Sequence, residues 1–311
     1  MRIVFMGSSE FGIPALEEII KKGHSFAGIV STPAREKGRG LVLTESPVAE
    51  YARQKGYAPI FTPENLVSKT FAEELKKLDA DVFVVVAFRI LPETVFSIPP
   101  LGTYNIHASL LPRYRGPAPI QRAIAAGEKE TGVTIFRINQ GVDTGRIVLA
   151  KKISIADDET APQLSGRLSQ LGADALGEAL ALIEDGRTEF TGQNDSLACG
   201  APKLTKSEGK ISWDAPAAAI FNRIRAFKPF PGTFTFLDNL RIGIEWAVPV
   251  TGGTALPGEA GTVCGIGADG FDVQCASGWL RVLSVKPEGK KSMPAPDFMH
   301  GRGIKQGTRF S

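Results

Sequence analysis

Short apolar runs alternate with amphipathic segments through the first 185 residues of the chain. The runs at 3–6, 26–31, 81–86, 103–107, 133–137 and 147–153 predict buried strands. Apolar residues at helical spacing predict helices at 14–22, 46–55, 69–78, 118–126 and 162–184. Ser46 and Pro47 suit the start of one helix, and Gly23 and Gly56 stand just past two helix ends. This alternation predicts an α/β fold with a doubly wound, mostly parallel Rossmann-like sheet.

The pattern changes after Gly186. Residues 188–205 are polar and irregular, which is typical of a linker. A helix at 215–226 precedes short strands, punctuated by glycine, at 232–237, 240–248, 261–267, 270–275 and 279–287. These strands predict a small, OB-like β-barrel, and the patterning from Pro294 onward is weak. We therefore expect a first domain over 1–187, a linker over 188–205 and a second domain over 206–311.

Length and composition agree with a globular protein of two domains. The chain has 311 residues, of which 43% are hydrophobic and 22% charged. Its apolar runs are much shorter than a membrane span, and a strand pattern that begins at residue 2 leaves no room for a signal peptide. The cysteines, Cys199, Cys264 and Cys275, lack the CxxC spacing of a redox or metal motif. We expect a cytoplasmic protein with reduced cysteines.

Charge differs between the two predicted parts. From Lys203 onward there are 14 Lys and Arg against 9 Asp and Glu, whereas the first 202 residues carry 22 against 24. A mildly basic second part suits a polyanion such as a nucleic acid, and ordinary surface scatter accounts for it equally well.

The first strand leads into the sequence Gly7-Ser8-Ser9-Glu10-Phe11-Gly12. It lacks the middle glycine of the dinucleotide fingerprint and the Lys-Ser/Thr of a phosphate loop. We interpret it as a tight turn from strand to helix. An NAD-dependent oxidoreductase is accordingly a weak alternative.

Chemistry concentrates between Gly102 and Gly145. Asn105 and His107 stand near the end of a predicted strand, where alternation puts both side chains on one face. The ends of parallel strands border the ligand crevice of α/β sheets. An amide there can donate to a developing oxyanion, and an imidazole can exchange protons near neutral pH. A lone His is more often structural, but the Asn partner favours a functional one. One central His without a Cys pair predicts no metal site.

Two loop motifs follow. Ser109-Leu110-Leu111-Pro112-Arg113-Tyr114-Arg115-Gly116 comes directly after the strand and is rich in Pro and Arg, which is typical of a binding loop. Asp143 lies in Gly141-Val142-Asp143-Thr144-Gly145. An Asp between glycines is often only a turn residue, but its carboxylate could also orient the imidazole and stabilise its charged form.

Together these motifs resemble the core of the 10-formyltetrahydrofolate-dependent formyltransferases. The resemblance implies a catalytic trio of Asn105, His107 and Asp143. It implies a folate-contacting loop of Ser109, Leu110, Leu111 and Pro112, with 10-formyltetrahydrofolate as formyl donor and no metal. One departure is Ala87-Phe88-Arg89-Ile90-Leu91-Pro92, which is one residue shorter than the family's usual segment beside the pterin pocket. We assign Phe88 and Arg89 no role.

Three further features resemble the subfamily that formylates initiator methionyl-tRNA. They are Gly38-Arg39-Gly40 within the long loop 32–45, the junction at 201–213, and the segments 223–232 and 289–293. The resemblance, which extends to about residue 300, implies a monomer that produces N-formylmethionyl-tRNA for translation initiation. It implies tRNA contacts from Arg39, Lys206, Lys210, Arg223, Arg225, Lys290 and Lys291.

We expect the methionyl α-amine to attack the formyl carbon. Asn105 would donate to the oxyanion, His107 would exchange protons with the amine or the leaving folate nitrogen, and Asp143 would orient His107. One alternative is the same chemistry on an amino sugar nucleotide. Another is a non-catalytic tRNA-binding protein, which the intact trio disfavours.

Overall fold

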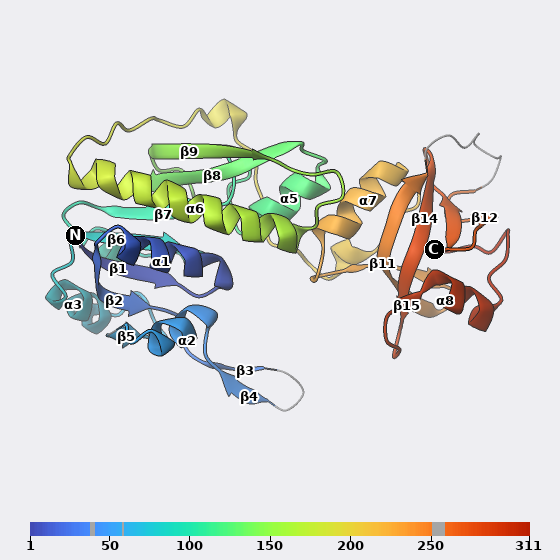
Figure 1. Cartoon of the computed structure of the whole chain (residues 1–311), viewed down its shortest axis with the longest axis horizontal. Coiled ribbons are helices and arrows are strands. Elements are labelled where there is room, and N and C mark those ends of the chain that lie inside the picture. The colour runs from blue at the N-terminus through green and yellow to red at the C-terminus, as the bar shows by residue number, and fades with distance from the viewer. Residues whose placement is uncertain (38–40, 58, 251–258) are drawn as a thin grey trace. The chain divides into compact units, whose positions relative to one another are not determined.

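The structure is a computed structural model that describes residues 1–37, 41–57, 59–250 and 259–311. The chain divides into two compact units (Figure 1). The first comprises Met1–Pro119, Glu130–Ser154 and Ser165–Pro202, and the second comprises Ile120–Lys129, Ile155–Leu164 and Lys203–Ser311. Each unit is built around its own sheet.

Seven strands form the sheet of the first unit, in the order β5-β2-β1-β6-β7-β8-β9. They are β1 (Arg2–Gly7), β2 (Ser25–Val30), β5 (Ile60–Phe61), β6 (Val82–Val86), β7 (Thr103–His107), β8 (Glu130–Arg137) and β9 (Ile147–Ser154). Neighbouring strands from β5 to β7 pair parallel, and β8 and β9 add antiparallel. The mostly parallel sheet predicted from the sequence is confirmed. Since β9 follows β8 after a short connection, these two strands can only pair antiparallel.

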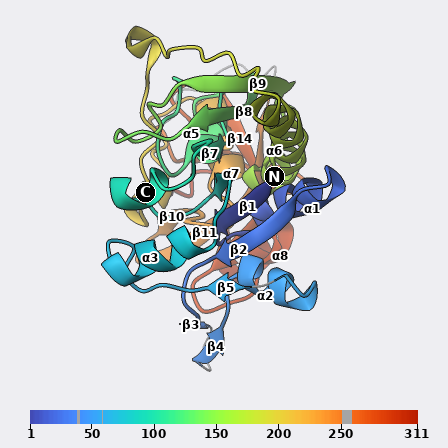
Figure 2. The ribbon, with the colours of Figure 1, turned by 90° about the vertical axis from the view of Figure 1, so that its left-hand side faces the viewer.

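Helices cover both faces of this sheet (Figure 2). They are α1 (Ile13–Lys21), α2 (Pro47–Gln54), α3 (Lys69–Lys77), α4 (Glu93–Phe96) and α6 (Ala161–Glu184), while α5 (Pro119–Ala125) precedes β8. In Figure 2, α1 and α6 lie on one side of the strands and α3 on the other. Phe71 and Leu75 of α3 and Val95 of α4 pack against Phe83 and Val85 of β6.

Local sequence explains where these elements begin and how closely they pack. The Ser46 hydroxyl accepts a hydrogen bond from the Ala49 backbone N–H at 3.1 Å, which confirms the predicted N-cap of α2. Gly172 lets α6 pack closely against the sheet. A Cβ at Gly172 would lie 2.9 Å from Cγ2 of Ile106 in β7. α6 therefore packs directly against Ile106 of β7.

The sheet of the second unit has the order β10-β11-β14-β13-β12, with β15 on the other part of β14. Its strands are β10 (Thr233–Leu237), β11 (Leu240–Val250), β12 (Val263–Ile266), β13 (Phe271–Gln274), β14 (Trp279–Pro287) and β15 (Met293–Pro294). All pair antiparallel. Helices α7 (Ala217–Ala226) and α8 (Ala295–Arg302) complete the unit.

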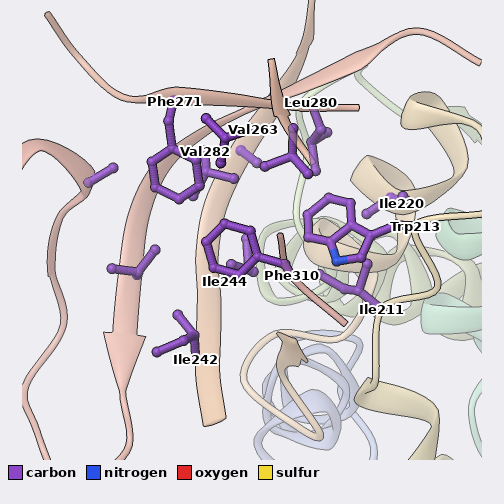
Figure 3. Packing of buried hydrophobic residues seen from close by; sticks show 14 of the residues in the cluster. Ile211, Trp213, Ile220, Ile242, Ile244, Val263, Phe271, Leu280, Val282 and Phe310 are labelled. Carbon is purple, nitrogen blue, oxygen red and sulfur yellow. The ribbon is translucent and has the colours of Figure 1, made fainter. Parts of the chain in front are cut away.

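The last four residues connect the two edges of this sheet. Ser311 exchanges two backbone hydrogen bonds of 2.9 Å with Phe236 of β10. The Val263 N–H of β12 donates to the Thr308 carbonyl at 2.8 Å. Pairing of one segment with both edges closes the sheet, which confirms the OB-like barrel. Figure 3 shows the enclosed core, in which the rings of Phe271 and Phe310 stack with centroids 5.5 Å apart.

Several elements were not predicted. Within the predicted loop 32–45, β3 (Arg35–Lys37) and β4 (Val42–Thr44) form a hairpin. The short elements β5 and α4 and the helix α8 also lacked a sequence signal. The polar stretch after α6 holds two 3₁₀ turns, η2 (Asp195–Leu197) and, further on, η3 (Ser207–Gly209). Up to Pro202 it belongs to the first unit, to which Thr191 and Gly200 bridge at Ile147 and Arg115.

Candidate active site

Strand β7 presents Asn105 and His107 on the same face, two residues apart. They stand opposite Phe136 and Thr134 of β8. His107 is buried, with 6% of its surface exposed, whereas Asn105 is partly exposed. Within the described part of the chain, no group hydrogen-bonds the Asn105 amide. This amide is thus free to donate to a bound molecule.

His107 lies between a backbone carbonyl and a carboxylate. Its Nε2 is 2.8 Å from the carbonyl oxygen of Tyr114. A carbonyl only accepts, so Nε2 carries a hydrogen and donates it. Nδ1 is 3.6 Å from Oδ2 of Asp143, which is longer than a direct hydrogen bond. Nδ1 is therefore the ring nitrogen that is left to exchange a proton with a reacting group, and the Asp143 carboxylate lies beside it.

The sequence around Asp143 builds a tight loop between β8 and β9. The Asn139 side-chain oxygen accepts from the Gly141 N–H at 3.1 Å and from the Thr144 hydroxyl at 2.9 Å. Asp143 has a φ of 54°, which Asp tolerates better than most residues. A Cβ at Gly145 would lie 1.7 Å from the Arg137 carbonyl oxygen, so only glycine fits. At Gly141, a Cβ would instead meet the Thr144 side chain.

The loop after β7 is fixed by its own polar groups. The Ser109 hydroxyl is fully buried and donates to the Arg113 carbonyl at 2.6 Å. Thr134 of β8 donates to the Ser109 carbonyl at 2.7 Å and accepts from the Leu111 N–H at 3.1 Å. Of the four residues predicted to contact folate, Ser109 and Leu111 are buried, and Leu110 and Pro112 are partly exposed. Ser109 therefore shapes the loop from inside.

Several residues that hold the site were not found from the sequence. The Gly116 N–H donates to Oδ2 of Asp143 at 2.8 Å. Gln193, from the predicted linker, donates to the carbonyls of Asp143 and Gly145 at 2.9 and 2.8 Å. Its oxygen accepts from Arg115. No sequence pattern marks Gln193, because its partners are about 50 and 80 residues away in the chain and are brought to it by folding.

The shortened segment 87–92 has a structural function at Arg89. Its guanidinium donates to the backbone carbonyls of Pro63 and Glu64 at 2.7 and 3.0 Å. Burial lowers the pKa of this guanidinium. Arg89 therefore connects the segment after β6 to the segment before α3.

The predicted tRNA contacts differ in accessibility. Lys206, Lys210, Lys290 and Lys291 are exposed. Arg223 is partly exposed and its guanidinium donates to the Glu208 carbonyl. Arg39, with its neighbours Gly38 and Gly40, lies outside the described residues.

Arg225, another predicted tRNA contact, is buried in the structure. This residue is 2% exposed. Its guanidinium donates to the Glu159 carbonyl at 3.0 Å and to the Asn222 side-chain oxygen at 2.9 and 3.0 Å. Burial lowers its pKa. Arg225 therefore connects α7 to the segment before α6 within the second unit.

Neither a metal-binding cluster nor a helix that could span a membrane occurs among the described residues. No group of three or more His, Cys, Asp or Glu is arranged to hold a metal ion. None of the helices combines the length and apolar character that a membrane span requires.

Known proteins resemble the chain over both units. The formyl transferase family model matches residues 1–180, and the model of the formyl transferase C-terminal domain matches residues 203–303. These matches define the class as formyl transferase. The methionyl-tRNA formyltransferase of Geobacter sulfurreducens is 39% identical over 311 residues, covering 100% of this chain and 96% of the relative. That of a Methylobacterium species is 41% identical over 320 residues, covering 100% and 99%. The chain belongs to the methionyl-tRNA formyltransferase family.

A solved structure agrees with the fold. The N-formyltransferase of Helicobacter canadensis, in complex with folinic acid and dTDP-3-aminofucose, matches with a TM-score of 0.66 over 91% of this chain and 98% of its own. At 20% sequence identity the likeness shows a shared fold alone.

Proposed function

We propose that this protein transfers the formyl group of 10-formyltetrahydrofolate to the α-amine of initiator methionyl-tRNA, giving N-formylmethionyl-tRNA for translation initiation. The observation that carries the proposal is the site on β7, where a free amide stands beside an imidazole paired with a carboxylate. Full-length similarity to methionyl-tRNA formyltransferases supports the choice of acceptor.

The three side chains have separate tasks. The Asn105 amide donates to the formyl oxygen as negative charge develops there during attack by the amine. His107 exchanges a proton at Nδ1, because Nε2 is held by the Tyr114 carbonyl. Asp143 keeps the ring oriented and balances the charge of its protonated form. These tasks leave one formyl group on the methionyl nitrogen and return a proton to the folate nitrogen.

The residues beside the site suit a folate. Leu110 and Pro112 are partly exposed on the loop that follows β7, and Leu111 lies buried between them. Their apolar surface fits a pterin ring, whose flat faces bury well against aliphatic side chains. The folate supplies the activated formyl group, and this loop holds it beside Asn105.

The tRNA contacts are proposed for the basic surface of the second unit. Lys206, Lys210, Lys290 and Lys291 are exposed and can each neutralise a phosphate. Arg223 can contribute its remaining donors, and Arg39 of the loop 32–45 is proposed as a contact to the acceptor end. Residues 1–187 form the proposed catalytic domain and 206–311 the tRNA-binding domain. We further propose a monomer that acts in the cytoplasm.

His107→Asn tests the site. The variant removes the proton-exchanging group and keeps a polar side chain of smaller size. Formylation of methionyl-tRNA should fall by about 10²- to 10⁴-fold, and its pH–rate profile should change shape. His300→Asn, at an exposed position on α8, is the control. A His107→Asn enzyme with the normal pH–rate profile contradicts the proposed proton exchange.

A further inference from the structure

Gln193 binds two segments of the first unit at once. Its side-chain oxygen accepts from Nε and Nη2 of Arg115 at 3.1 and 2.7 Å. Its side-chain nitrogen donates to the backbone carbonyls of Asp143 and Gly145 at 2.9 and 2.8 Å. Both ends of the Gln193 side-chain amide are therefore hydrogen-bonded to loops of the candidate site.

Arg115, which binds the Gln193 oxygen, is itself held by its backbone. Its backbone N–H donates to the Cys199 carbonyl at 3.0 Å, and its carbonyl accepts from the Ala201 N–H at 2.6 Å. The residue before it, Tyr114, accepts from His107, and the residue after it, Gly116, donates to the Asp143 carboxylate. One short stretch thus holds both members of the His107–Asp143 pair.

Gln193 is suited to its position by having an amide. A carboxylate accepts from Arg115 but cannot donate to the two carbonyls, and an ammonium donates but cannot accept. The Asp143 loop needs such support, because Val142 is largely exposed and Asp143 has a positive φ. Without Gln193 the carbonyls on both sides of Thr144 lose their donor.

We propose that Gln193 is a positioning residue for formyl transfer. Through the backbone of Asp143 and Gly145, it holds the Asp143 carboxylate beside Nδ1 of His107, where the carboxylate balances the charge of the protonated ring. This inference rests on the proposed function, because formyl transfer is the reaction through which it is measured.

Gln193→Ala and Gln193→Glu test it. Displacing a catalytic group by about 1 Å can cost about 100-fold in rate, so kcat should fall about 10- to 100-fold in both variants. The KM values for donor and methionyl-tRNA should stay within about threefold, since neither substrate touches Gln193 in this account. The matched control is Asp195→Ala, which removes the exposed partner of Arg115 and leaves the Gln193 contacts in place.

A double-mutant cycle separates positioning from general support of the fold. If Gln193 acts through Asp143, adding Gln193→Ala to Asp143→Asn should lower kcat little further. An equal loss in both backgrounds, or normal kcat in Gln193→Glu, overturns the inference. A wild-type protein that forms no formylmethionyl-tRNA overturns the proposed function instead, so the two failures are distinct. Gln193→Glu keeps the Arg115 contact and serves if the alanine variant does not fold.

A different observation concerns the second unit, which has a hollow of about 520 Å³ beside β10. It is lined by Lys206, Ser207, Phe230, Pro231, Phe234 and Arg241. Among the described residues, the lining contains two cationic side chains and no carboxylate. Its volume is within the range of sites for single small ligands, which is about 300–1,000 Å³.

Aromatic and cationic side chains both line this hollow. The Arg241 guanidinium stacks on the Phe234 ring, with its central carbon 4.0 Å from the ring centroid. Phe230 is 49% exposed and stands between Pro229 and Pro231, which restrict its backbone. Nearby, Lys210 lies over the Phe236 ring at 5.5 Å. Open ring faces next to cations bind a nucleobase together with its phosphate.

We infer that this hollow binds one unpaired nucleotide of the RNA substrate. The base stacks on Phe230, and Lys206 and Arg241 hold the adjacent phosphate. This inference also rests on the proposed function, which supplies the RNA, and it adds Phe230, Phe234 and Arg241 to the residues that contact it.

Phe230→Ala and Phe230→Tyr test stacking, with Ile266→Ala as control for loss of an equally exposed apolar side chain on the same barrel. Loss of one stacked base should raise the KM for methionyl-tRNA about tenfold in Phe230→Ala, while Phe230→Tyr and Ile266→Ala stay near wild type. Direct binding uses a fluorescent five-nucleotide RNA and its abasic counterpart. Equal affinity for both probes, or an unchanged KM in Phe230→Ala while the wild type remains active, contradicts base stacking.

Discussion

Asn105 and His107 share a strand face but differ in how they are held. His107 is fixed at Nε2 and flanked by Asp143, whereas the Asn105 amide has no hydrogen bond within the described residues. A rigid acid–base pair beside a free donor suits a reaction in which charge appears on one oxygen while a proton moves nearby.

Asn105→Ala removes that donor. Loss of one oxyanion donor typically lowers kcat by about 10²- to 10³-fold, and we expect this loss with little change in KM. Single-turnover formylation of methionyl-tRNA measures it, with the melting temperature as a check on folding. Near-normal turnover in this variant would show that Asn105 does not stabilise the developing charge.

Gly145 tests the packing of the Asp143 loop. In Gly145→Ala the new methyl group would overlap the Arg137 carbonyl oxygen, so the loop must shift and carry Asp143 with it. We expect kcat to fall by about tenfold or more and the melting temperature to drop. Gly166→Ala in α6 is the control, because a Cβ there meets no atom within 4 Å. A normal kcat in Gly145→Ala would mean that the loop position is not critical.

At the scale of elements, the hydrophobic pattern predicted the strands and helices that are well buried. The apolar run of β6 is reproduced, because a strand buried on both faces is continuously apolar. The range 103–107 of β7 is also reproduced, although this strand carries Thr103, Asn105 and His107. Helix α8 was missed since only Ala295, Phe298 and Met299 of its residues are buried. The hairpin of β3 and β4 was missed because Leu43 and Val42 are exposed, so burial leaves no alternation there.

The residues of the candidate site could be proposed from the sequence, whereas the residues that hold them in place could not. Asn105, His107 and Asp143 carry a local motif, so a short stretch of sequence suffices to propose them. Gln193 acts through contacts that only the folded chain creates. Arg225 was proposed as a tRNA contact from the family resemblance, and only the folded chain shows that this residue of α7 is buried.

The turn η3 depends on an ion pair that gives stability a pH dependence. A hydrogen bond from Arg122, at 2.6 Å, is the main cause that lowers the pKa of Glu208 from 4.5 to about 2. A depressed pKa means that the carboxylate stabilises the fold above about pH 4.5. This contribution is lost progressively as the pH falls from 4.5 towards 2.

Glu208→Gln isolates this effect. We expect the variant to melt at a lower temperature than wild type at pH 6, and the difference to shrink as the pH falls below 4.5. Thermal unfolding followed between pH 6 and pH 3 measures it. A difference that stays constant over this range contradicts the ionic contribution of Glu208.

At the scale of the whole molecule, charge is divided between the two parts of the chain. The residues from Lys203 onward carry more basic than acidic groups, and the preceding residues carry slightly more acidic ones. RNA binding through phosphate contacts should therefore depend on salt and on the second unit.

The KM for methionyl-tRNA should rise with ionic strength. Each of Lys206→Ala, Lys210→Ala, Lys290→Ala and Lys291→Ala that removes a phosphate contact should reduce the slope of log KM against log salt by about 1. Lys77→Ala, on the exposed surface of α3, is the control. A KM independent of salt contradicts an electrostatic contact with tRNA.

The most direct test offers the purified protein three acceptors at once. These are charged initiator methionyl-tRNA, a 4-amino sugar nucleotide and water, with 10-formyltetrahydrofolate as the donor. We expect N-formylmethionyl-tRNA as the dominant product, and its loss in the Asn105, His107 and Asp143 variants. Formylation of the sugar alone, or hydrolysis alone, would keep the chemistry of the site and contradict methionyl-tRNA as the acceptor.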